Sequence, residues 1–288
     1  MDILIAVDGT GTDNDADYKA EFGDPGALYC SPNQSHVFTM HQSWHHQKTK
    51  WYSRGPTMMG LTTHNLAASA ARAAIHMYKP GADRLFLAGY SRGGASVLQA
   101  ATLLYLRKIP VHAMFLYDAV DRAAGIVAAD TIPPNVKQCF HALRDPKARS
   151  RVYFGNCGLH ASPGVDLRPK SFVGTHGALG GMPWSASNAG SDGLINEHGE
   201  VTELVSGAAR TLTKGVAALA AVAAGPVGLV MAGTIISSTS LIAGVAARNS
   251  LTTTITPEQD MMTARAVGQW MTNNLVEVLR RNHGKPGA

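Results

Sequence analysis

One serine in this sequence lies in a pattern suited to nucleophilic chemistry. Residues 85–97 read Leu-Phe-Leu-Ala-Gly-Tyr-Ser-Arg-Gly-Gly-Ala-Ser-Val, an apolar run followed by a G-x-S-x-G core and a helical pattern. The order strand, sharp turn, helix is the context of a nucleophile elbow. Gly89 and Gly93 have no side chains, which allows the strand and the helix to approach closely. We therefore expect Ser91 at a helix N-terminus, where the helix dipole favours negative charge.

A serine nucleophile needs a base and an acid that orients the base. Residues 111–117, Val-His-Ala-Met-Phe-Leu-Tyr, are almost continuously apolar, which favours a strand buried on both faces of a mainly parallel sheet. This run ends at Asp118, and functional groups of open α/β sheets gather at the carboxyl ends of strands. Asp121 is the rival acid, although a charge at a helix N-terminus is the simpler role for it.

The candidate base is His176, which follows a short apolar run and stands in a glycine-rich loop. Residues 171–181 read Ser-Phe-Val-Gly-Thr-His-Gly-Ala-Leu-Gly-Gly. The chain order Ser91, Asp118, His176 matches the order Ser…Asp…His of α/β-hydrolases. The choice of His176 depends on this flanking pattern, because other histidines compete for the role: His141, His160 and His198.

A second glycine-rich turn follows the apolar run at residues 3–7 and reads Asp8-Gly9-Thr10-Gly11-Thr12. Backbone N–H groups in such a turn can bind an anion. We predict an oxyanion hole formed by the amide of Arg92 together with the amide of Gly9 or Thr10. Taken alone, residues 8–12 are equally compatible with an ordinary turn.

Two clusters suggest metal binding, and neither fits. Asp13, Asp15 and Asp17 alternate as at the start of a calcium loop, but Tyr18 replaces the required glycine, so an EF-hand is rejected. Residues 23–60 read as irregular and polar and contain four histidines whose spacing matches no standard zinc site. We expect this segment to border the site, with no metal and no organic cofactor.

Composition and charge restrict the class of partner. The chain has 288 residues, of which 45% are hydrophobic and 16% charged, so a sizeable core is expected. The net charge of +5 is mild and the chain has no dense Lys/Arg block beyond Arg280-Arg281, which disfavours nucleic acid but permits an anionic lipid surface. The three cysteines lack C-x-x-C spacing, which argues against a disulfide framework. The first residues do not resemble a signal peptide.

Six short motifs follow one another between about residues 3 and 184. They are Asp8-Gly9-Thr10; Tyr52 with Arg54-Gly55-Pro56; Gly89-Tyr90-Ser91-Arg92-Gly93; Tyr117-Asp118-Ala119-Val120; His141-Ala142-Leu143-Arg144-Asp145; and Gly174-Thr175-His176 with Gly180-Gly181. In this order they resemble a bacterial family of α/β-hydrolases that includes phospholipase effectors of type VI secretion systems. The chain departs from that family at Ala119, where threonine is frequent, and at Gly177-Ala178, where Ser-Asp is frequent. No match extends beyond Leu194.

The resemblance implies a catalytic triad of Ser91, Asp118 and His176 and lipase or phospholipase action on carboxylic esters of lipids. It also implies synthesis in the bacterial cytoplasm, secretion by a route that needs no signal peptide, and an immunity or delivery protein as partner. Two alternatives come from the residues themselves. One is an esterase for small soluble esters, and the other is a membrane-perturbing or binding protein on a hydrolase scaffold.

The expected fold is α/β-hydrolase-like, one domain over residues 1–288 with a mainly parallel sheet and flanking helices. The patterns predict strands at 3–7, 85–90, 111–117 and 152–157, a short apolar run at 171–173, and helices at 62–78, 93–108 and 256–281. Thr256 and Pro257 are typical of a helix start. The apolar side predicted for this last helix comprises Ala266, Trp270, Leu275 and Val278.

We expect residues 204–251 to form an apolar, Gly/Ala-rich helical region appended to or inserted in this fold. Within it, 33 consecutive positions from Gly215 to Ala247 carry no charge, which is long enough for a membrane helix. Gly225-Pro226 and Gly228 divide the stretch into two arms. Three interpretations remain open: a buried helical pair, a lid that faces lipid, and a hairpin that inserts into the membrane.

Aspartate at Leu229 or Ile235 tests these interpretations. If the apolar stretch lines the entrance to Ser91, either change should impair hydrolysis of a long-chain phospholipid far more than hydrolysis of a short soluble ester, because each CH₂ removed from water contributes about 0.8 kcal/mol. Initial rates on the two substrates provide the measurement. Equal loss on both, with reduced thermal stability, would identify plain core, and equal retention would show that the stretch contacts neither site nor lipid.

Overall fold

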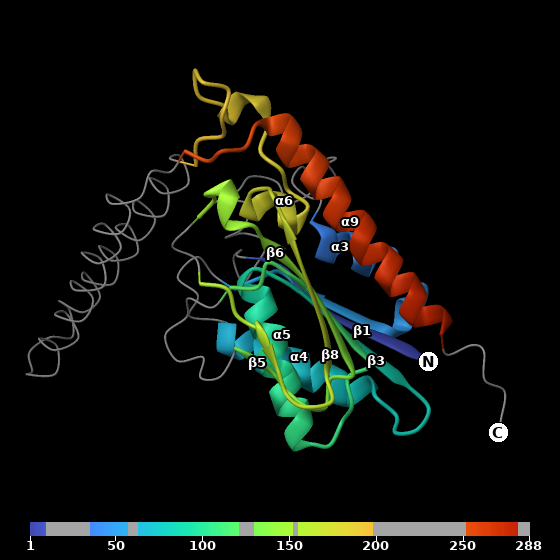
Figure 1. The fold of residues 1–288 in the computed structure, drawn as a ribbon. Coiled ribbons are helices and arrows are strands. Elements are labelled where there is room, and N and C mark those ends of the chain that lie inside the picture. Colours follow the sequence, from blue (N-terminus) through green and yellow to red (C-terminus); the bar gives the residue numbers. More distant parts are fainter. Residues whose placement is uncertain (10–34, 57–62, 121–129, 152–154, 198–251, 282–288) are drawn as a thin grey trace, which may run out of the picture.

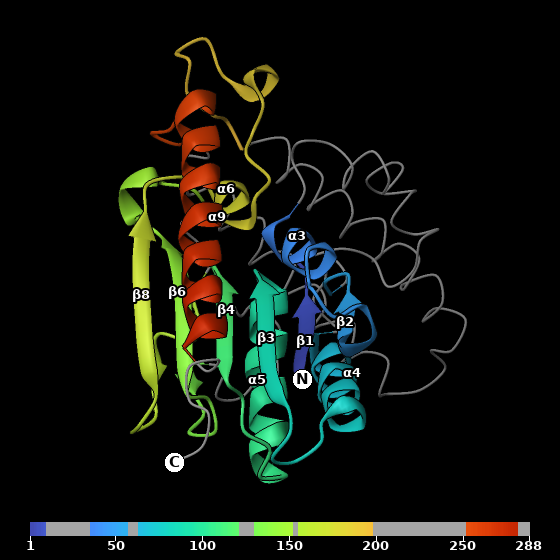
Figure 2. The ribbon, with the colours of Figure 1, turned by 90° about the vertical axis from the view of Figure 1, so that its right-hand side faces the viewer.

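A six-stranded, wholly parallel sheet lies at the centre of the computed structural model, which describes residues 1–9, 35–56, 63–120, 130–151, 155–197 and 252–281. In spatial order the strands are β2 (Lys50–Ser53), β1 (Asp2–Val7), β3 (Arg84–Tyr90), β4 (Ala113–Tyr117), β6 (Gln138–Arg144) and β8 (Asp166–Phe172). A separate pair joins β5 (Thr131–Ile132) to β7 (His160–Ala161). Because all six strands run in one direction, their carboxyl ends meet at one edge (Figure 2).

Helices cover both faces of the sheet (Figures 1 and 2). Helices α4 (Thr63–Met77) and α5 (Arg92–Leu106) pack on one face, and α3 (His36–Gln42), α6 (His176–Gly180) and α9 (Pro257–Arg280) lie on the other. The period of two in the strands produces this arrangement: Ile3 and Ile5 join the core under α4 and α5, whereas Leu4 joins the core under α3 and α9. The chain therefore has the predicted α/β fold with a parallel sheet flanked by helices.

The strongly patterned elements form where the sequence predicts them, namely β1, β3, β4, α4, α5 and α9. The interpretation of residues 23–60 as irregular is wrong where the structure describes them, because α3, the 3₁₀ turn η1 (Gln47–Thr49) and β2 lie there. Strand β6 was not predicted, and β8 begins at Asp166, well before the apolar run at 171–173. Strand β8 is an edge strand with mostly exposed, polar residues, so no apolar alternation marks it.

Two predicted segments lie wholly or partly outside the described residues. Of the strand expected at 152–157, only residues 155–157 are described, and Asn156 there forms an isolated antiparallel bridge with Val120. The apolar region 204–251 is entirely outside the described ranges. Within those ranges, no helix combines the length and apolarity that crossing a membrane requires.

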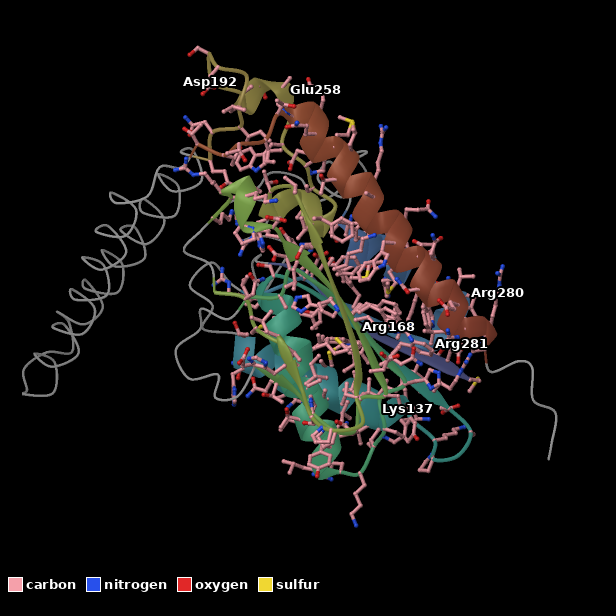
Figure 3. All side chains as sticks on the ribbon, viewed as in Figure 1. Lys137, Arg168, Asp192, Glu258, Arg280 and Arg281 are labelled. Carbon is pink, nitrogen blue, oxygen red and sulfur yellow. The ribbon has the colours of Figure 1, made fainter. Side chains whose placement is uncertain are left out.

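Both ends of helix α9 carry residues that favour a helix terminus. Thr256 accepts a hydrogen bond from the Gln259 amide, and the Gln259 side chain accepts one from the Thr256 amide, which completes a capping box. Glu258 stands at the first turn and Arg280 at the last, at opposite ends of the helix in Figure 3, as the helix dipole favours. The buried side carries Ala264, Val267, Met271 and Val278, whereas Ala266 is exposed, so the predicted apolar side was misplaced at that residue.

Replacing Thr256 by alanine removes the oxygen that caps the first turn of α9. We expect the free energy of unfolding to fall by about 1 kcal/mol, as measured by urea denaturation. Thr272→Ala is the matched control, because Thr272 is exposed within the same helix, where alanine is the better helix former. Equal stability of the two variants would contradict the importance of this cap.

Candidate active site

Ser91 occupies a strained turn between β3 and α5. It has φ 55° and ψ −129°, a conformation that non-glycine residues rarely adopt. A Cβ at Gly93 would lie 2.1 Å from the backbone oxygen of Asp8, and one at Gly89 would lie 2.7 Å from that of Gly93. Both glycines are therefore required by the close packing of β1, β3 and α5. The turn has the predicted form of a nucleophile elbow.

His176 lies between Ser91 and Asp118. Its Nε2 is 2.9 Å from Oγ of Ser91, and its Nδ1 is 2.6 Å from Oδ2 of Asp118. An ionised carboxylate can only accept, so Nδ1–H donates to Asp118 and the lone pair of Nε2 accepts the Ser91 hydroxyl proton. The three side chains that the sequence singled out are thus joined in the order acid, imidazole, hydroxyl, although they come from three separate segments of the chain.

All three residues are buried, with Ser91 4%, Asp118 0% and His176 1% exposed. Burial lowers the pKa of His176 to about 4, since desolvation disfavours the imidazolium. The Asp118 carboxylate opposes this change, and the Arg151 and Arg144 charges add to it. The imidazole is therefore neutral at pH 7, the state in which Nε2 can accept a proton.

Asp118 is held by more than its histidine. Arg144 approaches Oδ2 with Nε at 3.2 Å and donates its backbone N–H to Oδ1 at 3.2 Å, while Asn156 donates to Oδ1 at 2.7 Å. Burial alone would raise the pKa of Asp118, but the Arg144 charge and the hydrogen bonds from His176 and Asn156 hold it at about 2. The carboxylate is ionised at every pH at which the imidazole is neutral.

The backbone of His176 is fixed on both sides. Its N–H donates to Oγ of Ser150 at 2.9 Å, and its carbonyl accepts from the Tyr90 hydroxyl at 3.0 Å. Ser150 in turn donates to the buried Glu197 carboxylate at 2.9 Å. Tyr90 immediately precedes Ser91, so this hydroxyl connects the loop of the base directly to the elbow.

Helix α9 supports the same loop from the other side. Asp260, in its first turn, accepts from the amide and hydroxyl of Thr175 at 2.7 and 2.8 Å, and from the Trp184 amide at 2.9 Å. The Thr175 hydroxyl also accepts from the Ala178 amide and thereby caps α6, the helix that begins at His176. A helix far along the sequence thus determines where the candidate base stands.

His141 is close to the triad but has a different environment. Its Nε2 accepts from the Ala119 amide at 3.2 Å and its Nδ1 donates to the Gly158 carbonyl at 3.2 Å. Burial lowers its pKa to about 4, so the ring is neutral at pH 7 and both nitrogens are occupied by the backbone. His141 therefore supports the turn after Asp118 and has no nitrogen directed at Ser91.

Several other predicted residues lie away from the triad or beyond the described ranges. His160 is an exposed residue of β7 and faces Asp130 at 3.4 Å. Among the described residues, no group of three or more His, Cys, Asp or Glu side chains has an arrangement that could hold a metal ion. Those outside the described ranges are the rival acid Asp121, the competing His198, the calcium-like triplet and the oxyanion candidate Thr10.

The two described oxyanion candidates flank the elbow. Arg92 is the first residue of α5, so its amide stands at the helix N-terminus directly after Ser91. Gly9 packs against the Tyr90 ring, where a Cβ would come within 2.5 Å of Cδ1. The Gly9 amide donates to Oδ1 of Asp8 at 2.8 Å, so this conformation directs that N–H to a carboxylate. Binding of an oxyanion by Gly9 remains a prediction that requires this bond to open.

The comparisons with known proteins yield only distant similarity. No protein-family model and no curated protein matches the chain. The structure of the Tle1 effector bound to the VgrG spike from the Type 6 secretion system aligns with a TM-score of 0.37 at 14% identity, over 62% of this chain and 50% of that one. A crystal structure of an uncharacterized protein from Pseudomonas aeruginosa aligns with a TM-score of 0.33 at 14% identity, over 65% and 42%. The chain spans half or less of the length of these proteins, and its function must be inferred from the geometry of its own site.

Proposed function

We propose that this protein is a serine hydrolase that cleaves carboxylic esters, with Ser91 as nucleophile, His176 as base and Asp118 as the acid that orients the base. The observation that carries the proposal is the pair of short contacts on one imidazole, 2.9 Å from Nε2 to the Ser91 hydroxyl and 2.6 Å from Nδ1 to the Asp118 carboxylate. The strained backbone of Ser91 supports the same role, because such strain recurs where a nucleophile must be presented.

In the first half-reaction, Oγ of Ser91 bonds to the ester carbonyl carbon while its proton passes to Nε2 of His176. Asp118 stabilises the resulting imidazolium through the Nδ1–H hydrogen bond. The tetrahedral intermediate then collapses, the carbon–oxygen bond to the alcohol breaks, and the imidazolium returns the proton to the leaving alkoxide. The product of this step is the free alcohol and an acyl-enzyme on Ser91.

In the second half-reaction, water attacks the acyl carbon and gives its proton to Nε2 of His176. Collapse of the second tetrahedral intermediate releases the carboxylic acid, and the proton returns to Oγ of Ser91. The negative oxygen that forms in both steps is stabilised at the N-terminus of α5, where the Arg92 amide is a candidate donor. This chemistry needs neither metal nor organic cofactor.

We propose lipid esters, with phospholipids foremost, as the substrate class. The support is the ordered set of six sequence motifs that resemble phospholipase effectors, together with the uncharged stretch from Gly215 to Ala247. The same resemblance supports secretion without a signal peptide and partner proteins for delivery and immunity, and these stay predictions. An esterase for small soluble esters and a membrane-perturbing protein are the outcomes against which the lipid proposal is tested.

Replacing Ser91 by alanine should abolish ester hydrolysis and labelling by a fluorophosphonate probe, because the hydroxyl that forms the acyl-enzyme is gone. Turnover is measured on a panel of phospholipids, acylglycerols and short nitrophenyl esters. Ser96→Ala is the matched control, since Ser96 is a buried serine of α5, the helix that follows Ser91, and within the described residues its hydroxyl donates to backbone carbonyls. Labelling that persists in Ser91→Ala would move the nucleophile elsewhere, and dye leakage from vesicles by this variant would favour the membrane-perturbing alternative.

Replacing Asp118 by asparagine, or His176 by alanine, should lower kcat by several orders of magnitude, because the first change favours the wrong imidazole tautomer and the second removes the base. Asp121→Asn and His141→Ala should lower kcat much less, since neither residue is assigned to proton transfer. Steady-state rates on one short ester provide the comparison. A larger loss in Asp121→Asn than in Asp118→Asn would contradict the assignment of the orienting acid.

A further inference from the structure

Arg144 contacts the candidate orienting acid with both its side chain and its backbone. It lies at the end of β6, its side chain is 6% exposed, and its Nε is 3.2 Å from Oδ2 of Asp118. Its backbone N–H reaches the other carboxylate oxygen, and its Nη2 donates to Oδ1 of Asn156 at 3.2 Å. Asn156 then donates to Asp118, so arginine and asparagine hold the carboxylate together.

The oxygen that Arg144 approaches is the one that accepts the His176 proton. Oδ2 is 2.6 Å from Nδ1 of His176 and 3.2 Å from Nε of Arg144. A single carboxylate charge therefore faces two cations whenever the imidazole is protonated. The fixed guanidinium charge favours ionised Asp118, and it adds to the Arg151 charge in disfavouring imidazolium.

Other charged or titratable groups surround this pair and act in the same site. From β3 the Tyr90 ring lies 5.0 Å from the imidazole, and the Arg151 charge further disfavours imidazolium. The remaining groups, by element, are Asp8 after β1, His141 on β6, Glu197 beside Ser150, and Asp260 on α9 beneath Thr175. Among these residues, only Arg144 brings a cation into direct contact with Asp118.

We propose that Arg144 is a positioning residue for the hydrolase: it fixes the Asp118 carboxylate in line with His176 and, as a permanent counter-ion, keeps His176 available as a base in acidic solution. This inference rests on the proposed function. Activity should be lost on the acid side as the pH falls through the pKa of His176, which is lowered to about 4. Removing the Arg144 charge raises the pKa of both His176 and Asp118, so the acid limb must move to higher pH.

The test compares the pH dependence of kcat/KM for the wild type, Arg144→Gln and Arg144→Lys on a short ester between pH 3.5 and 8. Arg144→Gln should move the acid limb upward by about one pH unit, the lower end of the range for a neighbouring charge, because loss of the cation raises the pKa of Asp118 and of His176. Arg144→Lys should keep the acid limb close to that of the wild type while lowering kcat, because an ammonium preserves the charge without the planar fork. A purely structural arginine would change kcat without moving the acid limb.

Arg84→Gln is the matched control. Arg84 forms a partly buried ion pair with Asp2 at 2.6 Å, at the amino-terminal ends of β3 and β1. The Arg84→Gln change therefore also breaks an Arg–Asp pair between neighbouring strands. This variant should leave the acid limb unchanged. An equal shift in Arg84→Gln, or no shift in Arg144→Gln, would overturn the role of Arg144.

A titration of the His176 ring by NMR, assigned against the His176→Ala spectrum, gives a second readout that needs no turnover. The ring should titrate below pH 5 in the wild type and at a higher pH in Arg144→Gln. If Arg144→Gln does not fold, the His176 titrations of the wild type and of Arg144→Lys are used instead. A titration midpoint of His176 near the ordinary 6.5 in either protein overturns the proposal. Absence of both ester turnover and probe labelling would refute only the proposed function. The titration of the His176 ring would still be measurable and would still test the effect of Arg144 on it.

Discussion

The structure around the candidate site depends on one buried negative charge. Asp118 has no exposed surface, and an isolated carboxylate in such a position would cost several kcal/mol. It is stable there because donors from three segments converge on its two oxygens. They are Arg144 at the end of β6, Asn156 in the segment before β7, and His176 at the start of α6. The charge therefore links three distant segments to the end of β4.

The candidate base is also held by contacts from several separate segments. His176 is connected through its backbone to Ser150 and Tyr90, and through Thr175 to Asp260 of α9. These contacts hold the backbone from which the imidazole extends between Asp118 and Ser91. Preorganisation of this kind reduces the reorganisation needed in the transition state, which is the main way in which enzymes stabilise developing charge.

Backbone strain occurs where two neighbouring buried strands of the parallel sheet end. Ser91 and Asp118 both have positive φ, 55° and 43°, and each directly follows a buried strand. The cores on both faces of the sheet hold these strands in place, and α4 and α5 complete the packing behind the elbow. The energy of local strain is thus offset by apolar burial elsewhere in the sheet.

The sequence by itself determined the α/β class, six of the main elements and the identity of the three residues that meet at the site. It could do so because buried parallel strands and amphipathic helices have distinct periods, and because an elbow needs glycines at fixed offsets. Only the tertiary structure decided that Arg144, Asn156, Ser150 and Asp260 contact or support these three residues. Arg144 stands in one of the six sequence motifs, but the role of each of the four arises from contacts between segments distant in sequence, which no local pattern predicts. It also revealed β2, β6 and the polar edge strand β8, whose pairing depends on neighbouring strands rather than on their own periodicity.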